Sequence, residues 1–162
     1  MNIHNYQYKI YRNPFELNDI LEARRNDETI VFGNGCFDVL HVGHMRYLYS
    51  AKDLGDILII AVNTDASIAR IKPEKKLVFP EDERLELIAG IGAVDYVVPL
   101  EEDTPISLIK LFRPNIHTKG TDYIDRFIPE RATVESYGGR VELVGDPKNH
   151  SSTQIINGIK RS

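Results

Sequence analysis

The chain has 162 residues, of which 42% are hydrophobic and 27% charged, and its formal net charge at pH 7 is −4. This composition excludes an intrinsically disordered chain, and the length fits one domain of ordinary size. The negative charge argues against a sequence-independent grip on nucleic-acid phosphates, so we expect no nucleic-acid partner. The single cysteine, Cys36, excludes an internal disulfide and fits a reducing compartment.

No apolar run approaches the ~18 residues that a membrane helix requires, and residues 1–11 lack the apolar core of a signal peptide. We therefore expect a cytoplasmic protein that makes no contact with a membrane. No repeat, low-complexity tract or linker composition marks a boundary, so we expect one domain over residues 1–162. Residues 1–28 form its leading segment, in which apolar spacing predicts a helix at 14–25.

Short apolar runs alternate with helical patterns along the chain. The expected order is helix 14–25, strand 29–33, helix 43–54, strand 57–63, helix 81–91, strand 95–98, helix 105–112, strand 115–119, helix 129–137, strand 140–144 and helix 152–160. The run ILIIAVN at 57–63 is apolar almost throughout, which is typical of a strand buried on both faces of a sheet. Strand–helix–strand alternation predicts an α/β fold with a doubly wound, mostly parallel five-stranded sheet of the Rossmann-like type.

The first strand leads into the segment NGCFDVLHVGH at residues 34–44. In doubly wound sheets, ligands bind beyond the carboxyl ends of the strands. Gly35 would let the backbone approach a ligand, and Gly43 would keep the start of the next helix uncrowded. The unpaired amides of that helix start suit a phosphate, with His41 and His44 as neighbouring donors. This segment is therefore the first candidate phosphate site.

Other interpretations of the segment remain open. A His-x-x-His pair can be a solvated helix edge, and Cys36, His41 and His44 could be zinc ligands, although no fourth ligand stands at a recognised spacing. Cys36 could also be a catalytic thiol, but no second element of a nucleophilic site accompanies it. We expect no metal site made of protein ligands. Asp38 is expected to organise the turn by accepting hydrogen bonds from backbone amides.

Near the end of the chain, the segment KNHSSTQII at 148–156 places Ser151, Ser152 and Thr153 before an apolar run. The simplest interpretation is a helix N-cap. Three hydroxyls at one helix start could equally form a second phosphate cradle.

Several positions between these motifs also carry candidate chemistry. A basic stretch occupies an expected loop and consists of Arg70, Lys72, Lys75 and Lys76. It could be a solvated surface, or one lysine could reach a phosphate. Arg84 opens the next helix, where it could make a surface ion pair or support a site. Gly120 and Asp122 follow another strand, where Gly120 would allow close approach of a nucleotide and Asp122 could accept a hydrogen bond.

The pattern G-x-F-D-x-x-H-x-G-H at 35–44 resembles the signature of the cytidylyltransferase-like nucleotidyltransferases. The resemblance implies a nucleotide-binding α/β fold in which His41 and His44 contact the nucleotide phosphates and stabilise charge as the α-phosphate is attacked. The hydroxyls at 151–153 are similar to the family's S-T-T motif, which grips the triphosphate. The segment 119–123 resembles K-G-G-D-Y, with Thr121 in place of the second glycine.

Lys72 matches a position where relatives carry a basic residue, and Arg84 resembles an arginine that supports the site. The resemblance thus implies catalytic roles for His41, His44 and Lys72, and substrate binding by Lys72 and Arg84. It implies that the nucleotide-binding residues are Cys36, Phe37, Asp38, His41, Gly43, His44, Gly120, Asp122, Ser151, Ser152 and Thr153.

Within the family, the segments at 54–67, 93–99 and 101–105 look like those of the adenylyltransferases that form ADP-heptose. That resemblance implies AMP transfer from ATP to D-glycero-D-manno-heptose 1-phosphate, with Mg²⁺ carried mainly by the nucleotide phosphates, and a homodimer. No kinase-sized region precedes the motifs, so we expect the stand-alone form.

The competing resemblance is to glycerol-3-phosphate cytidylyltransferases, which use CTP. Their second motif carries an arginine five residues before the serine, where this chain has Asp146, and Lys148 is displaced from that position. A third possibility is a nucleotide-sensing module without catalysis. The intact histidine pair argues against this, because binding alone would not require both rings.

Overall fold

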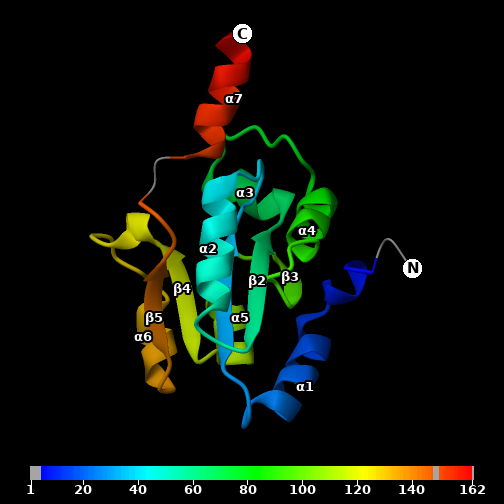
Figure 1. Cartoon of the computed structure of the whole chain (residues 1–162), viewed down its shortest axis with the longest axis vertical. Helices are drawn as coiled ribbons and strands as arrows, with labels where there is room; N and C mark the ends of the chain where they lie inside the picture. Colours follow the sequence, from blue (N-terminus) through cyan, green and yellow to red (C-terminus); the bar gives the residue numbers. More distant parts are fainter. Residues whose placement is uncertain (1–4, 148–149, 162) are drawn as a thin grey trace.

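The computed structural model describes residues 5–147 and 150–161. Its centre is one sheet (Figure 1), whose strands are β1 (Ile30–Gly35), β2 (Ile57–Asn63), β3 (Tyr96–Leu100), β4 (Ile116–Gly120) and β5 (Arg140–Val144). The strand order is β3-β2-β1-β4-β5, and all pairings between the strands are parallel. The prediction of a doubly wound, five-stranded α/β sheet is confirmed. The order reverses between the β1–β2 and β1–β4 pairs, which is where such sheets bind ligands.

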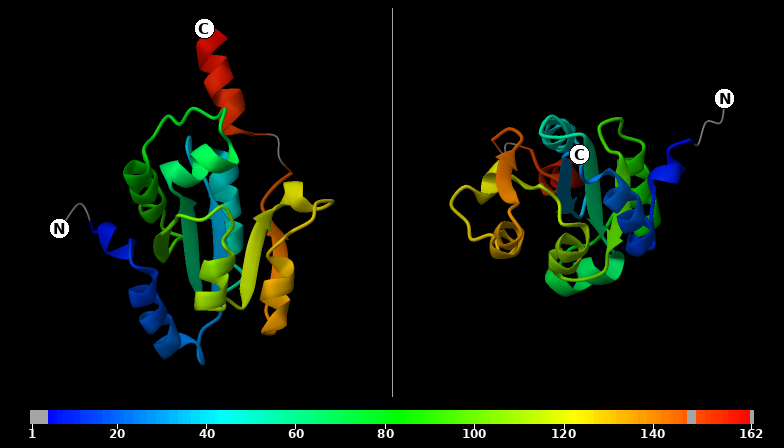
Figure 2. Two further views of the ribbon diagram at one scale, coloured as in Figure 1. Left: turned by 180° about the vertical axis from the view of Figure 1, so that it is seen from behind. Right: turned by 90° about the horizontal axis from the view of Figure 1, so that it is seen from below.

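Helices cover both faces of the sheet (Figure 2). One face carries α2 (Val42–Lys52) and α4 (Glu81–Ala89), and the other carries α1 (Pro14–Arg24), α5 (Ile106–Phe112) and α6 (Arg131–Ser136). Each face has its own buried apolar cluster, because alternate residues of a strand point to opposite faces. In β1, for example, Val31 belongs to the α2 side and Phe32 to the α1 side.

The remaining elements lie around the carboxyl end of the sheet or at its edge. They are α3 (Asp65–Ile71), α7 (Ser152–Arg161) and two short 3₁₀ helices, Gln7–Lys9 and Thr121–Tyr123. Helix α7 extends away from the top of the sheet in Figure 1. Among the described residues, no helix is long and apolar enough to cross a bilayer.

Strand β2 occupies the residues expected from its sequence, and all seven are buried. Strand β1 continues two residues beyond the expected 29–33, because Asn34 and Gly35 pair with Ala61 and Val62. Helix α3 includes Arg70, which was expected in a loop. Its N-cap residue is Thr64, whose side chain accepts a hydrogen bond from the Ser67 amide at 3.1 Å.

Residues 5–24 of the leading segment run past the edge strand β3 and continue into α1 on one face of the sheet. Leu17 and Leu21 of α1 are fully buried. The Tyr11 amide donates to the Val97 carbonyl at 2.8 Å, and the Lys9 ammonium donates to the Val94 carbonyl at 2.8 Å. These contacts are made with residues before β3 and near its amino end, and the strands bind ligands at their carboxyl ends, so their effect is on the stability of the fold.

Candidate active site

A cleft of about 630 Å³ lies beyond the carboxyl ends of the strands. Strand-end residues Asn34, Asn63 and Lys119 reach it from three neighbouring strands. The cleft contains nearly every residue singled out from the sequence. Those that line it are Cys36, Phe37, Asp38, His41, Gly43, His44, Lys72, Gly120, Asp122, Ser151, Ser152 and Thr153. Lys148 and Asn149 of the second motif lie outside the described residues.

The two histidines of the first motif cap α2 reciprocally. His41 is the N-cap residue, and its Nδ1 accepts a hydrogen bond from the Gly43 amide at 3.1 Å. His44 Nδ1 accepts from the His41 amide at 3.2 Å. An Nδ1 that accepts carries no proton, so in each neutral ring the proton is on Nε2. Both rings can therefore donate from Nε2, which suits the oxygens of a phosphate.

Gly43 is required by this ring packing, because a Cβ there would lie 2.9 Å from two atoms of the His41 ring. At Gly35 the space that a side chain would need is filled by the Phe37 ring, 3.0 Å from the position of a Cβ. Phe37 has a positive φ of 49°, in the left-handed region that few residues other than glycine adopt. Its ring then packs against His44, with the centroids 5.5 Å apart. The turn after β1 thus supports the ring of His44.

The second motif joins the first across 113 residues of sequence. Ser152 Oγ donates to the carbonyl of Val39 at 2.8 Å, and the His150 ring lies 6.3 Å from the His41 ring. Ser151 Oγ accepts from the Gln154 amide at 3.1 Å, so it caps α7 as the simplest interpretation predicted. The start of α7 is therefore docked beside the start of α2, and two helix beginnings share one cleft.

Asp38 holds a different segment from the one expected. Its carboxylate is 1% exposed and accepts hydrogen bonds from the amides of Val78 at 3.0 Å and Phe79 at 2.9 Å, about forty residues further along the chain. Among the described residues, its hydrogen-bond donors are these amides and not those of its own turn. It anchors residues 72–80, which we call the basic strap because it carries Lys72, Lys75 and Lys76. Lys72 and Lys75 line the cleft.

Arg84 does not line the cleft, as a substrate-binding role would require, and its ion pair with Asp65 is fully buried on the arginine side, but its contacts agree with the expectation that it supports the site. It is fully buried, and its guanidinium donates to Cys36 O, Asn63 O and Asp65 Oδ1, each at 2.7 Å, and to Phe79 O at 3.1 Å. These acceptors belong to the turn after β1, the end of β2, the start of α3 and the basic strap. Arg84 thus holds together the segments that form the wall of the cleft, from a buried position behind that wall.

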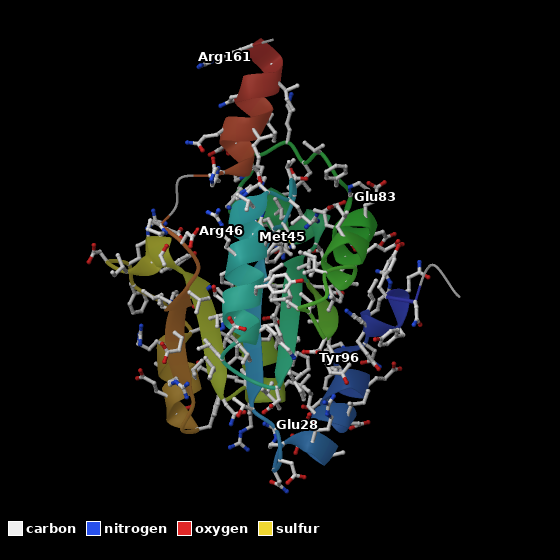
Figure 3. All side chains as sticks on the ribbon, viewed as in Figure 1. Glu28, Met45, Arg46, Glu83, Tyr96 and Arg161 are labelled. Atoms are coloured by element: carbon white, nitrogen blue, oxygen red, sulfur yellow. The ribbon has the colours of Figure 1, made fainter. Side chains whose placement is uncertain are left out.

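Asp146 pairs with Arg46 of α2, labelled in Figure 3, with Nη1 2.6 Å from Oδ2. Both residues line the cleft. A positive charge from α2 thus stands close to the position where glycerol-3-phosphate cytidylyltransferases are expected to carry an arginine, but here a carboxylate neutralises it.

Three further cleft residues, His150, Lys119 and Glu130, had not been assigned a role from the sequence. His150 belongs to the segment at 148–156, and Lys119 is the first residue of the segment resembling K-G-G-D-Y. Both could therefore have been selected from the sequence as site residues. Glu130 could not, because an acidic residue before a helix is common. Burial lowers the pKa of Lys119, and the charge of Glu130 opposes that shift.

Comparisons with known proteins agree with this architecture. Residues 32–159 match the family described as cytidylyltransferase-like. The chain is 48% identical over 144 residues to the bifunctional protein HldE of Syntrophotalea carbinolica, covering 88% of this chain and 29% of that protein. It is 46% identical over 144 residues to that of Geobacter metallireducens, with the same coverage of both chains. The chain therefore spans about three tenths of the length of these relatives.

A solved structure also resembles this one. The lipopolysaccharide core biosynthesis protein from Thermoplasma volcanium GSS1 superposes with a TM-score of 0.61 at 31% sequence identity, covering 76% of this chain and 99% of that chain. The family match extends from β1 to α7 and includes both motifs of the cleft. The chain belongs to the cytidylyltransferase-like family and is a nucleotidyltransferase.

Proposed function

We propose that the chain transfers AMP from ATP to D-glycero-D-manno-heptose 1-phosphate, giving ADP-heptose and pyrophosphate. One observation carries the proposal: the starts of α2 and α7 share a cleft lined by His41, His44, Ser152 and Thr153. Unpaired helix-start amides, ring N–H groups and hydroxyls are donors to phosphate oxygens. The resemblance of residues 54–67 and 93–99 to ADP-heptose-forming enzymes supports the choice of nucleotide and acceptor.

The reaction is a direct in-line displacement. An oxygen of the sugar phosphate forms a bond to the α-phosphorus of ATP while the bond from that phosphorus to the bridging oxygen breaks, and pyrophosphate leaves. The attacking phosphate is already ionised, so no strong general base is needed. His41 and His44 donate from Nε2 to the reacting phosphate oxygens and offset the charge that develops there.

Lys72 is the residue of the basic strap that we assign to neutralising phosphate charge. It follows the last turn of α3, where its amide donates to the Ile68 carbonyl at 2.8 Å, and it lines the cleft. Asp38 and Arg84 both hold the strap through Phe79. Their role in catalysis is therefore to place Lys72 over the cleft.

Mg²⁺ fits this cleft as a companion of the nucleotide. Over residues 5–147 and 150–161, no three His, Cys, Asp or Glu side chains form a cluster that could hold a metal ion. The Asp38 carboxylate is already engaged by two amides. These residues suit a Mg²⁺ held mainly by phosphate oxygens and water, where it would offset their charge.

A pyrophosphate-release assay tests the proposal. ATP and CTP are each supplied with D-glycero-D-manno-heptose 1-phosphate, other sugar 1-phosphates and glycerol 3-phosphate. We expect release with ATP and the heptose phosphate above all other pairs. A preference for CTP with glycerol 3-phosphate would replace the proposal with the cytidylyltransferase alternative, and nucleotide binding without release from any pair would indicate a sensing module.

A further inference from the structure

One wall of the cleft contains a buried ion pair. The two motifs assigned to phosphate binding, at 35–44 and 148–156, do not contribute residues to this pair. Lys119 is 8% exposed and Glu130 is 4% exposed, yet both line the cleft. Lys119 Nζ lies 3.5 Å from Glu130 Oε1 and donates to Asn34 Oδ1 at 3.2 Å. The same ammonium stands 5.1 Å from the centroid of the Tyr123 ring. Charged side chains are rarely buried this deeply without a specific reason.

The pair reaches the cleft from the opposite side of the sheet to the two catalytic histidines. In β4, Thr118 faces α2, where its Oγ1 lies 2.9 Å from the Tyr47 hydroxyl. Its neighbour Lys119 points to the other face, on which α5 and α6 pack (Figure 2). His41 is the N-cap residue of α2, and His44 lies in its first turn. The cleft therefore crosses the sheet edge, with phosphate donors on one side and the Lys119–Glu130 pair on the other.

The pair is not fully satisfied by the protein. Glu130 Oε2 is buried and has no hydrogen-bond partner within the described part of the chain. The 3.5 Å separation of Nζ and Oε1 is long for a hydrogen bond between charged groups. A buried carboxylate oxygen without a donor carries a desolvation cost that a bound hydroxyl would remove. The geometry is therefore incomplete in a way that a ligand could complete.

The charges around the pair favour a neutral polar ligand over a phosphate. Lys119 interacts electrostatically with Glu130 and Asp122, and the Arg126 guanidinium lies over the Tyr123 ring, so the formal charges of these four side chains sum to zero. The group offers donors, an acceptor and the face of the Tyr123 ring. Paired donors and acceptors beside an aromatic ring match the hydroxyl groups and C–H face of a sugar.

The geometry of an in-line displacement indicates that the sugar bound there is that of the acceptor and not the ribose of the nucleotide. In an in-line displacement, the attacking and leaving oxygens lie on opposite sides of the phosphorus. If the starts of α2 and α7 hold the triphosphate, the acceptor must approach from the far side of the sheet edge. That side is where Lys119 and Glu130 lie.

We propose that Lys119 binds hydroxyl groups of the acceptor's sugar, and that Asn34 and Glu130 position its ammonium for this contact. Glu130 is a positioning residue whose unpartnered oxygen accepts from a sugar hydroxyl when the acceptor is bound. The subsite determines which acceptor is used and leaves the phosphate chemistry to the histidines. The inference rests on the proposed function for the identity of the acceptor.

The test compares Lys119→Gln and Glu130→Gln with the wild-type chain. Initial rates of pyrophosphate release, measured with ATP and D-glycero-D-manno-heptose 1-phosphate, give kcat and a KM for each substrate. Loss of a hydrogen bond to a charged group should raise the acceptor KM by about 10- to 100-fold. The KM for ATP should stay within about twofold, because no nucleotide contact is removed.

Lys52→Gln is the matched control. It breaks another lysine–carboxylate pair, in which Lys52 Nζ lies 2.6 Å from Asp95 Oδ2, before the amino end of β3 and far from the cleft. A purely structural effect of losing an ion pair would appear in this control as well. Thermal midpoints of all variants report folding. If both variants in the buried pair fail to fold, Tyr123→Leu carries the same expectation from a half-buried position.

An unchanged acceptor KM in folded variants would overturn the inference. A rise in the KM for ATP alone would overturn it too, because the pair would then contact the ribose of the nucleotide. These outcomes differ from failure of the proposed function, which the wild-type chain reveals by itself. If the wild type uses CTP and glycerol 3-phosphate, the same comparison of KM values is made with that acceptor.

Discussion

The Nδ1 of His44 lies 3.2 Å from the backbone nitrogen of His41, and the two rings are in contact with their centroids 3.9 Å apart. A helix cap and a pair of phosphate donors are thus built from the same two side chains. Because each Nδ1 is used in capping, each ring is oriented with Nε2 away from its own backbone. Loss of either ring should therefore affect catalysis strongly and stability weakly.

His44→Ala should fold and turn over at least about a hundredfold more slowly, because one donor to the reacting phosphate is lost. Removal of the cap bond should cost only ~1 kcal/mol of the free energy of unfolding. Steady-state pyrophosphate release and urea denaturation measure the two effects separately. Near-normal turnover in the folded variant would refute the role assigned to His44.

Asp38→Asn should loosen the basic strap. The carboxylate accepts from two successive amides, and an asparagine oxygen would lose the charge that strengthens those bonds. We expect faster hydrogen exchange at Val78 and Phe79 and a lower kcat/KM, because Lys72 is no longer held over the cleft. Glu74→Gln, on the same strap, is the control and should leave exchange at both amides unchanged. Equal exchange rates in Asp38→Asn and the wild type would contradict the anchoring role.

Arg84→Met should be strongly destabilising, by about 3–5 kcal/mol, because it leaves a buried set of acceptors without a donor. The control is Arg12→Ala, which breaks an exposed ion pair with Asp82 and should cost less than about 1 kcal/mol. Urea denaturation of the two variants makes the comparison. If Arg84→Met is as stable as Arg12→Ala, the hydrogen bonds of Arg84 do not stabilise the wall of the cleft.

His117 should make stability depend on pH. Its ring is fully buried against Phe32, and burial lowers its pKa from 6.5 to about 3. Between those two values the unfolded chain binds a proton that the folded chain does not, so stability falls as the pH falls below about 6.5. The slope contributed by one such histidine is at most about 1.4 kcal/mol per pH unit.

His117→Phe should remove this contribution while keeping an aromatic ring in the same cluster. The free energy of unfolding of the variant and the wild type is compared from pH 7 to pH 5, where few carboxylates titrate. The variant should lose less stability over this range than the wild type. Parallel curves for the two proteins would show that the pKa of His117 is not lowered by folding.

The local sequence determined the elements and most of the cleft. Seven consecutive residues of β2 are buried on both faces, so their unbroken apolar run was sufficient to predict the strand. The motif after β1 and the hydroxyls before α7 could be recognised because phosphate binding at a helix start depends on a few neighbouring residues. Parallel strands bring their carboxyl ends to one edge, so the meeting of the two motifs followed from the predicted topology.

Tertiary structure alone decided what the charged side chains of the cleft do. Asp38 accepts hydrogen bonds from amides about forty residues away, and Arg84 donates to acceptors in four segments. Neither role can therefore be predicted from the neighbouring sequence. Glu130 became part of the cleft only because the start of α6 lies beside Lys119 of β4. A short motif records local geometry, whereas burial and partners of a charged group depend on which distant elements pack around it.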